Sequence, residues 1–155
     1  MSNEILTTVT HYILGLLHLR QIIAIVVMRI TIDIQPDTTL NELKHAFAQH
    51  FPYLKWEFFR HSHQHHEGSH KKDMILDNPT LQKITHQIQQ HHIEFHDTNS
   101  VQDIEQLIWD AFGLSVQVFR KSGNLWLETT VTDQWSLAYQ NEQGRELSAQ
   151  FDRKK

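Results

Sequence analysis

The chain has 155 residues, about one domain's length, and its 39% of hydrophobic and 21% of charged residues are ordinary for a protein that buries a core. The net charge of −4 with histidine neutral gives no basic footprint, so we expect no nucleic-acid partner. The absence of cysteine excludes disulfides, thiolate metal sites and cysteine nucleophiles, and it is compatible with a cytoplasmic location.

Residues 1–27 form an apolar N-terminal extension. The run from Tyr12 to Met28 is shorter than the about 20 residues that a spanning helix needs, and it contains His18 and Arg20. No positive segment precedes it, as one would in a secretory signal. Three interpretations stay open: a buried helix, an amphipathic or membrane-seeking tail, or translation upstream of a true start at Met28. We favour the third, and expect a membrane partner only if residues 12–28 are a native anchor.

Two similar segments follow, residues 28–60 and 91–120, and an offset of 61 places Ile32 on Ile93. Each segment starts with an alternating run that predicts a half-buried strand. A second strand ends each segment, at residues 55–60 and 115–120.

Between the two strands of each segment the sequence predicts a helix with a capping box at its start. The boxes are Thr39 with Glu42 and Ser100 with Asp103, and apolar residues at helical spacing follow both. Pro52 and Gly113 stop the two helices at equivalent places.

Two β-α-β units in tandem predict an α+β, ferredoxin-like fold, with two helices on one face of an antiparallel sheet. We expect one domain over residues 28–144. It divides into repeat one (28–60), a histidine-rich linker and helix (61–90), repeat two (91–120), and an added hairpin strand and short helix (121–144), before a polar, frayed tail (145–155). In the linker helix, Asn78 is the expected cap and Pro79 suits the first turn.

The added strand, Leu125 to Thr132, has two registers in a hairpin. A turn at Ser122-Gly123 places Phe119 opposite Trp126, whereas a turn at Gly123-Asn124 places Phe119 opposite Glu128. We favour the first, because it keeps apolar side chains together. After the strand, Asp133 is expected to cap a short helix that ends near Gly144.

Histidine is frequent in two places. The candidate metal ligands are His61, His63, His65, His66 and His70 in the linker, and His92 and His96 on the polar face of a strand. Imidazoles bind Zn²⁺, Ni²⁺ and Cu²⁺, but a built site also needs groups that hold its ligands in place. We therefore favour a solvated linker and strand face, with adventitious Zn or Ni and no resident cofactor.

Five aromatic residues are candidates for an exposed surface: Phe59, Phe119, Trp126, Trp135 and Tyr139. If Trp56, Phe58, Val116 and Val118 pack under the helices, the first three of the five lie on the opposite face of the sheet. RNA-binding sheets stack bases on such aromatics, but the strands differ here and the charge is acidic. Burial under the C-terminal helix or against a second subunit is the explanation that we favour.

Residues 112–144 read FGLSVQVFRKSGNLWLETTVTDQWSLAYQNEQG. This stretch resembles the C-terminal signature of a family of small uncharacterised bacterial α/β proteins, G-L-S-V-Q-V-F-R-K-S-G followed by W-L-E-T-T, T-D-x-W and Q-N-x-x-G. Weaker similarity runs back to about Met28. The resemblance implies a small α/β domain that starts there, and it implies no catalytic residue.

The sequence contains no phosphate-binding glycine loop, no nucleophile elbow and no zinc-protease motif. We therefore expect a binding or self-associating module, with a homo-oligomer as its partner, rather than an enzyme. One alternative is transition-metal binding through the histidines. The other is an enzyme or ligand binder with a pocket at the sheet face, beside the C-terminal helix.

Overall fold

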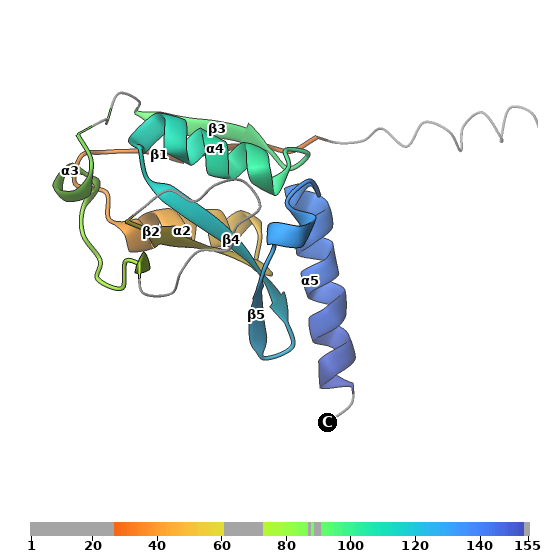
Figure 1. The fold of residues 1–155 in the computed structure, drawn as a ribbon. Coiled ribbons are helices and arrows are strands. Elements are labelled where there is room, and N and C mark those ends of the chain that lie inside the picture. The colour runs from red at the N-terminus through yellow and green to blue at the C-terminus, as the bar shows by residue number, and fades with distance from the viewer. Residues whose placement is uncertain (1–26, 61–72, 87, 89–90, 154–155) are drawn as a thin grey trace, which may run out of the picture.

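The computed structural model describes residues 27–60, 73–86, 88 and 91–153, so the predictions for residues 1–26 and 61–72 lie outside the described residues. The described chain is an α+β fold (Figure 1). Its elements are β1 (Arg29–Asp33), α2 (Leu40–His50), β2 (Leu54–Phe59), α3 (Leu81–Ile84), β3 (His92–His96), α4 (Val101–Phe112), β4 (Ser115–Ser122), β5 (Leu125–Glu128), the 3₁₀ helix η2 (Thr130–Thr132) and α5 (Leu137–Asp152). None of the helices within these ranges has both the length and the apolar content to cross a membrane.

The strands form two antiparallel sheets, β1–β3 and β2–β4–β5. Ile32 lies opposite Ile93 in the first sheet, and Trp56 lies opposite Val118 in the second. The expected ferredoxin-like single sheet is therefore corrected to two sheets. Alternating apolar residues fit a strand with one buried face in either arrangement, so the pattern could not distinguish them.

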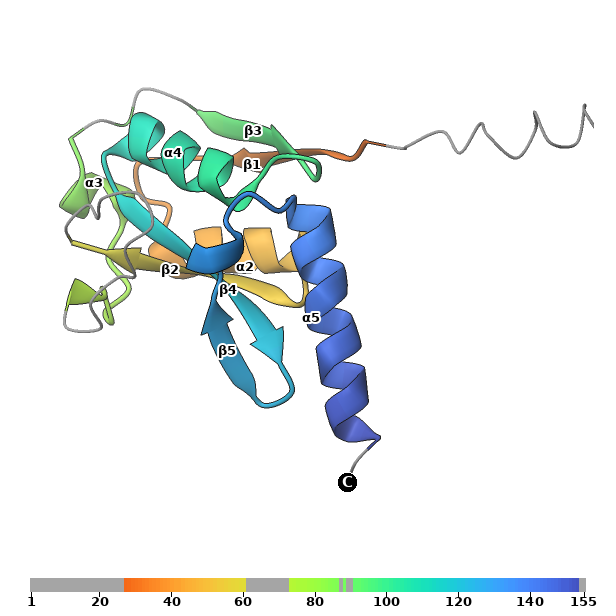
Figure 2. The ribbon, with the colours of Figure 1, turned by 45° about the vertical axis from the view of Figure 1, so that its right-hand side comes forward.

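The core lies between the two sheets and is closed by α2 and α4. The β1–β3 pair lies above β2 and β4 in both ribbon views (Figures 1 and 2). Aromatic rings join the layers: Phe47 of α2 stacks on Trp56 with centroids 4.3 Å apart, and the Phe95 ring of β3 lies 6.4 Å from Trp56. The predicted inward residues Trp56, Phe58, Val116 and Val118 are all buried, which confirms that face of the sheet.

Both main helices begin as predicted. The side chains of Thr39 and Ser100 accept hydrogen bonds from the N–H groups of Glu42 and Asp103, and both capping boxes are complete. Gly113 ends α4 with a φ of 63°, in the left-handed region that glycine tolerates.

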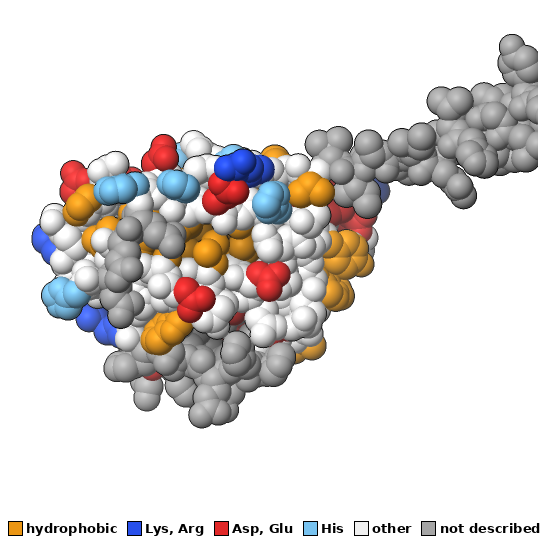
Figure 3. Space-filling view, turned by 90° about the horizontal axis from the view of Figure 1, so that it is seen from above, with side chains coloured by type: hydrophobic (Ala, Val, Ile, Leu, Met, Phe, Trp, Pro, Cys, Tyr) orange, Lys and Arg blue, Asp and Glu red, His pale blue; other side chains and the backbone are white. Residues whose placement is uncertain are grey.

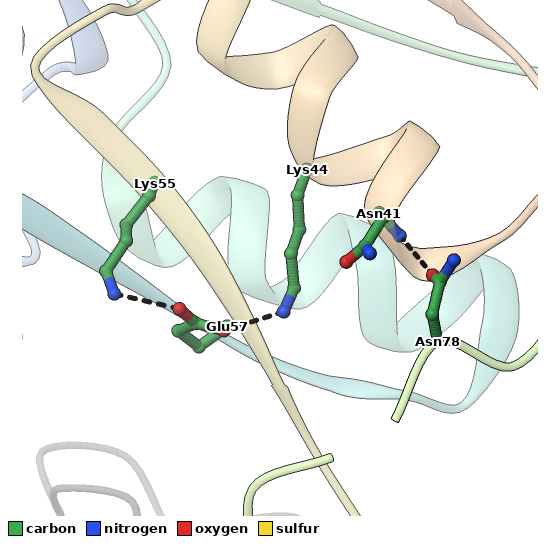
Figure 4. A network of polar contacts seen from close by, with 5 residues as sticks. All are labelled: Asn41, Lys44, Lys55, Glu57 and Asn78. Atoms are coloured by element: carbon green, nitrogen blue, oxygen red, sulfur yellow. Dashed lines mark hydrogen bonds and ion pairs between the residues drawn. The ribbon is translucent and has the colours of Figure 1, made fainter. Parts of the chain in front are cut away.

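The short helix α3 begins differently from the prediction. Its cap position is Thr80, and Asn78 instead caps α2, because the Asn78 side-chain oxygen accepts from the Asn41 N–H at 2.8 Å (Figure 4). The N–H of Leu40 donates to the Pro79 carbonyl at 3.2 Å. Residues 78–80 therefore pair N–H groups at the start of α2 that a free helix would leave without partners.

The two halves of the chain share a set of hydrogen bonds. Three bonds in the first half have counterparts in the second. The bond from Leu40 N–H to Pro79 O corresponds to that from Val101 N–H to Trp135 O. In the same way, the bonds from Leu81 N–H to Thr38 O and from Gln82 N–H to Pro36 O correspond to those from Leu137 N–H to Asn99 O and from Ala138 N–H to Asp97 O. Single bridges join Thr39 to Thr80 and Ser100 to Ser136. Helices α3 and α5 thus hold corresponding places, each beside the start of the main helix of its half.

The residues that flank the histidine-rich segment also have counterparts. Arg60 N–H donates to Asp73 O at 3.0 Å, and Ile75 N–H donates to Phe58 O at 2.8 Å. The second bond corresponds to the 3.4 Å bond from Thr129 N–H to Val118 O. Residues 73–75 therefore pair along the edge of β2, as β5 pairs along β4. We call them the companion segment of β2. Residues 61–72 connect β2 with this companion segment inside the first half, whereas we expected them to join the two units.

The hairpin uses the register that we rejected. Phe119 lies opposite Glu128 and Lys121 lies opposite Trp126, so the turn is Gly123-Asn124. Gly123 has a φ of 59°, as hairpin turns require at their first central position. All four residues of β5 are exposed. Because β5 is exposed in any case, a register that matches apolar residues across the hairpin would bury little surface. The geometry of the Gly123-Asn124 turn therefore determines the register.

Helix α5 is longer than predicted. The added strand ends at Glu128 rather than Thr132, and Ser136 rather than Asp133 caps the helix by accepting from the Tyr139 N–H. The helix continues through Gly144 to Asp152, so the predicted frayed tail is wrong. Close packing of its inner face against Tyr53 and Arg120 stabilises the helix despite the low helix propensity of glycine.

Candidate functional site

The five aromatic candidates divide into two groups. Phe59 and Phe119 are buried, with 1% and 9% of their surface exposed, so they do not belong to an exposed aromatic surface. Trp126, Trp135 and Tyr139 remain 38%, 36% and 49% exposed.

Contacts from distant parts of the chain surround the two buried aromatics. Phe59 pairs through its backbone with Met74, which extends the sheet beside it. The ammonium of Lys55 lies 5.2 Å from the ring centroid of Phe119, a cation–π contact. Neither contact follows from strand alternation, so the sequence could not separate these rings from the exposed ones.

An apolar strip on β5, made of Leu125, Trp126 and Leu127, is the most exposed apolar part of the second sheet. The three residues are 66%, 38% and 41% exposed. The ammonium of Lys55 lies 5.2 Å from the Trp126 ring, on the face of the sheet that also carries Phe119, which we call the outer face. In both ribbon views the hairpin extends below the body of the protein (Figures 1 and 2). The β5 strip is therefore accessible from solvent on both of its faces.

Trp135 and Tyr139 lie near the start of α5, with ring centroids 4.8 Å apart in an edge-on arrangement. The guanidinium of Arg120 lies 5.6 Å from the Trp135 ring. Arg120 also donates from Nη1 to Gln140 Oε1 at 2.6 Å. This aromatic pair is thus part of the contact between α5 and β4, and only its outer surface remains open.

The signature residues Q-N-x-x-G attach α5 to the second sheet. Gln140 is fully buried and donates to the Thr132 carbonyl at 2.7 Å, and Asn141 Oδ1 accepts from the Tyr53 N–H at 2.9 Å. Gly144 packs so closely that a Cβ atom placed on it would lie 2.8 Å from Tyr53 Cβ. These three residues have structural contacts that explain their identity without a catalytic role.

A row of polar side chains crosses the second sheet. Glu57 accepts from Lys44 Nζ at 2.7 Å and from Lys55 Nζ at 2.8 Å (Figure 4). Across the strands Glu57 faces Gln117, whose Nε2 donates to Glu105 Oε1 at 2.9 Å. Burial alone would raise the pKa of Glu57, but the hydrogen bonds from the two lysines outweigh it, and its pKa lies below the ordinary value. Glu57 therefore stays ionised at neutral pH.

No residue of this row was among the sequence-based candidates, and Glu105 is the one whose pKa changes most. It also accepts from the Val118 N–H at 3.0 Å. Burial raises the pKa of Glu105 to about 7, against the opposing hydrogen bond of Val118 and with a smaller contribution from the charge of Asp133. A signal was present, because Glu105 follows Val101 by four residues and precedes Ile108 by three, on the buried stripe of α4.

The Glu105→Gln variant tests this burial. The ordinary pKa is 4.5, so the folded protein binds the Glu105 proton more tightly than the unfolded chain does. The stability that this gives is complete below pH 4.5 and is lost as the pH rises through 7. We expect Glu105→Gln to be more stable than the parent at pH 8, by on the order of 2 kcal/mol, with little difference at pH 4.5. Urea unfolding at both pH values measures this. The exposed Glu146→Gln is the control, and an equal gain there would contradict the assignment.

The histidine candidates form no metal centre among the described residues, which bring no three potential ligands together. His92 and His96 lie on the outer face of β3, four residues and thus about 13 Å apart along the strand. Viewed from above, histidine side chains are spread among acidic and basic ones (Figure 3). His61, His63, His65, His66 and His70 lie outside the described residues, so metal binding by them stays a prediction.

A hollow of about 300 Å³ lies between β1 and α2. Asp33, Glu42 and His50 are among the side chains that line it. The pocket that we expected was elsewhere, between the sheet and the C-terminal helix. Among the described residues, no hydrogen bond joins Asp33, Glu42 and His50 to one another, so the hollow has no evident catalytic pair.

Comparison with protein-family models, with curated proteins and with solved structures finds no match for the chain. The resemblance to the bacterial family therefore stays a prediction that rests on the quoted motifs.

Proposed function

We propose that the protein is a non-enzymatic module that self-associates through the surface of its β4–β5 hairpin and the adjoining α5. One observation carries the proposal. Among the described residues eleven large apolar side chains are exposed, and seven of them lie between positions 125 and 151. They are Leu125, Trp126, Leu127, Val131, Trp135, Tyr139 and Phe151. This concentration of exposed apolar side chains in one stretch of the chain supports an interaction surface on these elements.

The character of β5 supports the same proposal. Edge strands of monomeric proteins are commonly protected by lysine, proline or a covering segment. Residues 125–127 contain neither residue type, and all of β5 is exposed. Covering this strand with a partner would remove apolar surface from water and pair open backbone groups.

Light scattering coupled to size-exclusion chromatography tests the proposal. We expect the mass of the parent protein to rise from monomer toward dimer with concentration, and Trp126→Ala to shift this rise to at least tenfold higher concentration, a change of about 1.4 kcal/mol in association free energy. Trp109→Ala is the matched control, since Trp109 is 41% exposed and belongs to α4, which lies away from β5 in both ribbon views (Figures 1 and 2). A monomer at all concentrations, or equal effects of the two variants, would contradict the proposal.

We also infer that the two halves are copies of one unit, a strand, a main helix, a strand with a companion segment, and a docked helix. The hydrogen bonds that recur at corresponding positions support this. So does the correspondence of the Lys44–Glu57 contact with the Glu105–Gln117 contact. On composition alone we place the protein in the cytoplasm, because the chain has no cysteine, and we expect no nucleic-acid partner.

A further inference from the structure

The backbone of β5 has an open side. Thr129 faces β4, because its N–H and its hydroxyl both bond to the Val118 carbonyl, at 3.4 and 2.9 Å. Backbone groups of successive strand residues turn to opposite sides, so Leu127 and Leu125 also face β4 while Glu128 and Trp126 face outward. No strand of the described residues lies on that outward side. The N–H and C=O of Trp126 are therefore positioned to bond a further strand.

When β5 is paired with an antiparallel copy of itself, its apolar side chains can face apolar side chains of the copy. We propose that two copies of the chain pair their β5 strands edge to edge, about a two-fold axis at Trp126. This rests on the proposed self-association and specifies its geometry. Trp126 then faces its own copy on the outer face, and Leu125 faces Leu127 of the other copy on the opposite face. Asn124 faces Glu128, so both polar residues stay at the ends of the paired segment. The pairing makes one six-stranded sheet from two three-stranded ones.

Two other symmetric registers are close to this one. One has its axis at Leu125, where Trp126 faces Asn124. The other has its axis at Leu127. There Leu127 faces its own copy, but Trp126 faces Glu128 and Leu125 faces Thr129. Only the axis at Trp126 places all three apolar side chains of the β5 strip against apolar partners, which cross-strand contacts favour. It also forms a hydrogen-bonded pair at the axis, since the open backbone groups belong to Trp126.

Cysteine variants test the register, because the chain has no cysteine of its own. Leu125→Cys and Leu127→Cys chains are mixed in equal amounts under mild oxidation, and each is also oxidised alone. We expect the mixture to form a disulfide dimer at least fivefold faster than either chain alone. Facing residues in the proposed pair lie within disulfide reach, whereas two copies of residue 125 are displaced by two positions, beyond about 7 Å.

The outcomes separate the two proposals. Rapid crosslinking by Leu127→Cys alone, or a mixture no faster than the single chains while light scattering still shows a dimer, overturns the edge pairing and leaves self-association standing. A parent protein that stays monomeric to about 1 mM removes both. Circular dichroism of each variant shows whether it is folded before its result is read.

Hydrogen exchange of the parent protein gives a second reading that needs no substitution. We expect the amides of Trp126 and Glu128 to gain protection as the concentration rises. The amides of Leu125 and Leu127 face β4 in the monomer and should change little. Equal gains at all four amides would indicate a contact that does not use the open strand edge, and would overturn the pairing.

Discussion

Replacing Phe47 with alanine is expected to cost about 3–5 kcal/mol of unfolding free energy. Phe47 of α2 is fully buried, and its ring packs against one strand of each sheet and against Phe51. Its ring lies 4.3 Å from Trp56 of β2, 5.1 Å from Phe51 at the end of α2, and 6.4 Å from Phe95 of β3. Removing it leaves a cavity where both sheets meet the helix, and packed neighbours cannot all move inward to fill that cavity.

Urea unfolding followed by tryptophan fluorescence and circular dichroism measures this loss. Trp109→Ala serves as the control, because the indole is 41% exposed and its removal should cost clearly less than removal of the fully buried Phe47 ring. Similar losses for the two variants would show that Phe47 does not join the sheets as described. A variant too unstable to measure would be replaced by Phe47→Leu, for which a smaller loss of the same sign is expected.

Gly144→Ala is expected to destabilise the protein by about 2 kcal/mol, although alanine is the better helix former. A Cβ at this position would lie 2.8 Å from Tyr53 Cβ, 3.0 Å from the Tyr53 carbonyl oxygen and 3.2 Å from Arg120 Cγ. Tyr53 contributes backbone as well as side chain to this contact, so a rotamer change cannot relieve it. The helix must move outward, which weakens the hydrogen bond between Asn141 and the Tyr53 N–H.

The sign of this effect decides between two explanations. If helix propensity dominated, Gly144→Ala would stabilise the protein by up to about 1 kcal/mol. Ala149→Gly, an exposed site in the same helix, measures propensity alone and should cost about 1 kcal/mol. Loss of stability in both variants, measured by urea unfolding, is the expected result. A stabilised Gly144→Ala would mean that α5 does not pack closely on Tyr53.

The close contact at Gly144 also bears on the β5 strip. The ring of Phe151, two turns further along α5, would lie 2.6 Å from a Cβ placed on Gly123 in the hairpin turn. Helix α5 therefore contacts the β4–β5 hairpin at two places, where Gly144 meets Arg120 and where Phe151 meets Gly123. Movement of α5 in Gly144→Ala should loosen the hairpin and weaken self-association together with stability. Trp126→Ala removes a partly exposed ring and its contact with Lys55, and it leaves the packing of α5 in place.

Local chemistry along the chain determined most of the elements. The capping boxes at Thr39 and Ser100 could be predicted because the groups that start a helix lie within four residues of one another. Alternation at Ile30 and Ile32 indicated a strand for the same reason, since strand geometry turns successive side chains to opposite faces. These features depend on near neighbours only, and the structure has them where the sequence placed them.

Tertiary structure alone decided which strands pair, how long α5 is, and which surface stays open. A strand with one buried face looks the same in one sheet or two, and Gly144 reads as a helix end until Tyr53, distant in the chain, lies against it. The raised pKa of Glu105 likewise needs the burial that the second sheet supplies. The sequence by itself predicted a strand that starts with Leu125, Trp126 and Leu127. That this strand lies at an edge with its Trp126 backbone turned outward depends on contacts between residues far apart in the chain, which no local pattern records.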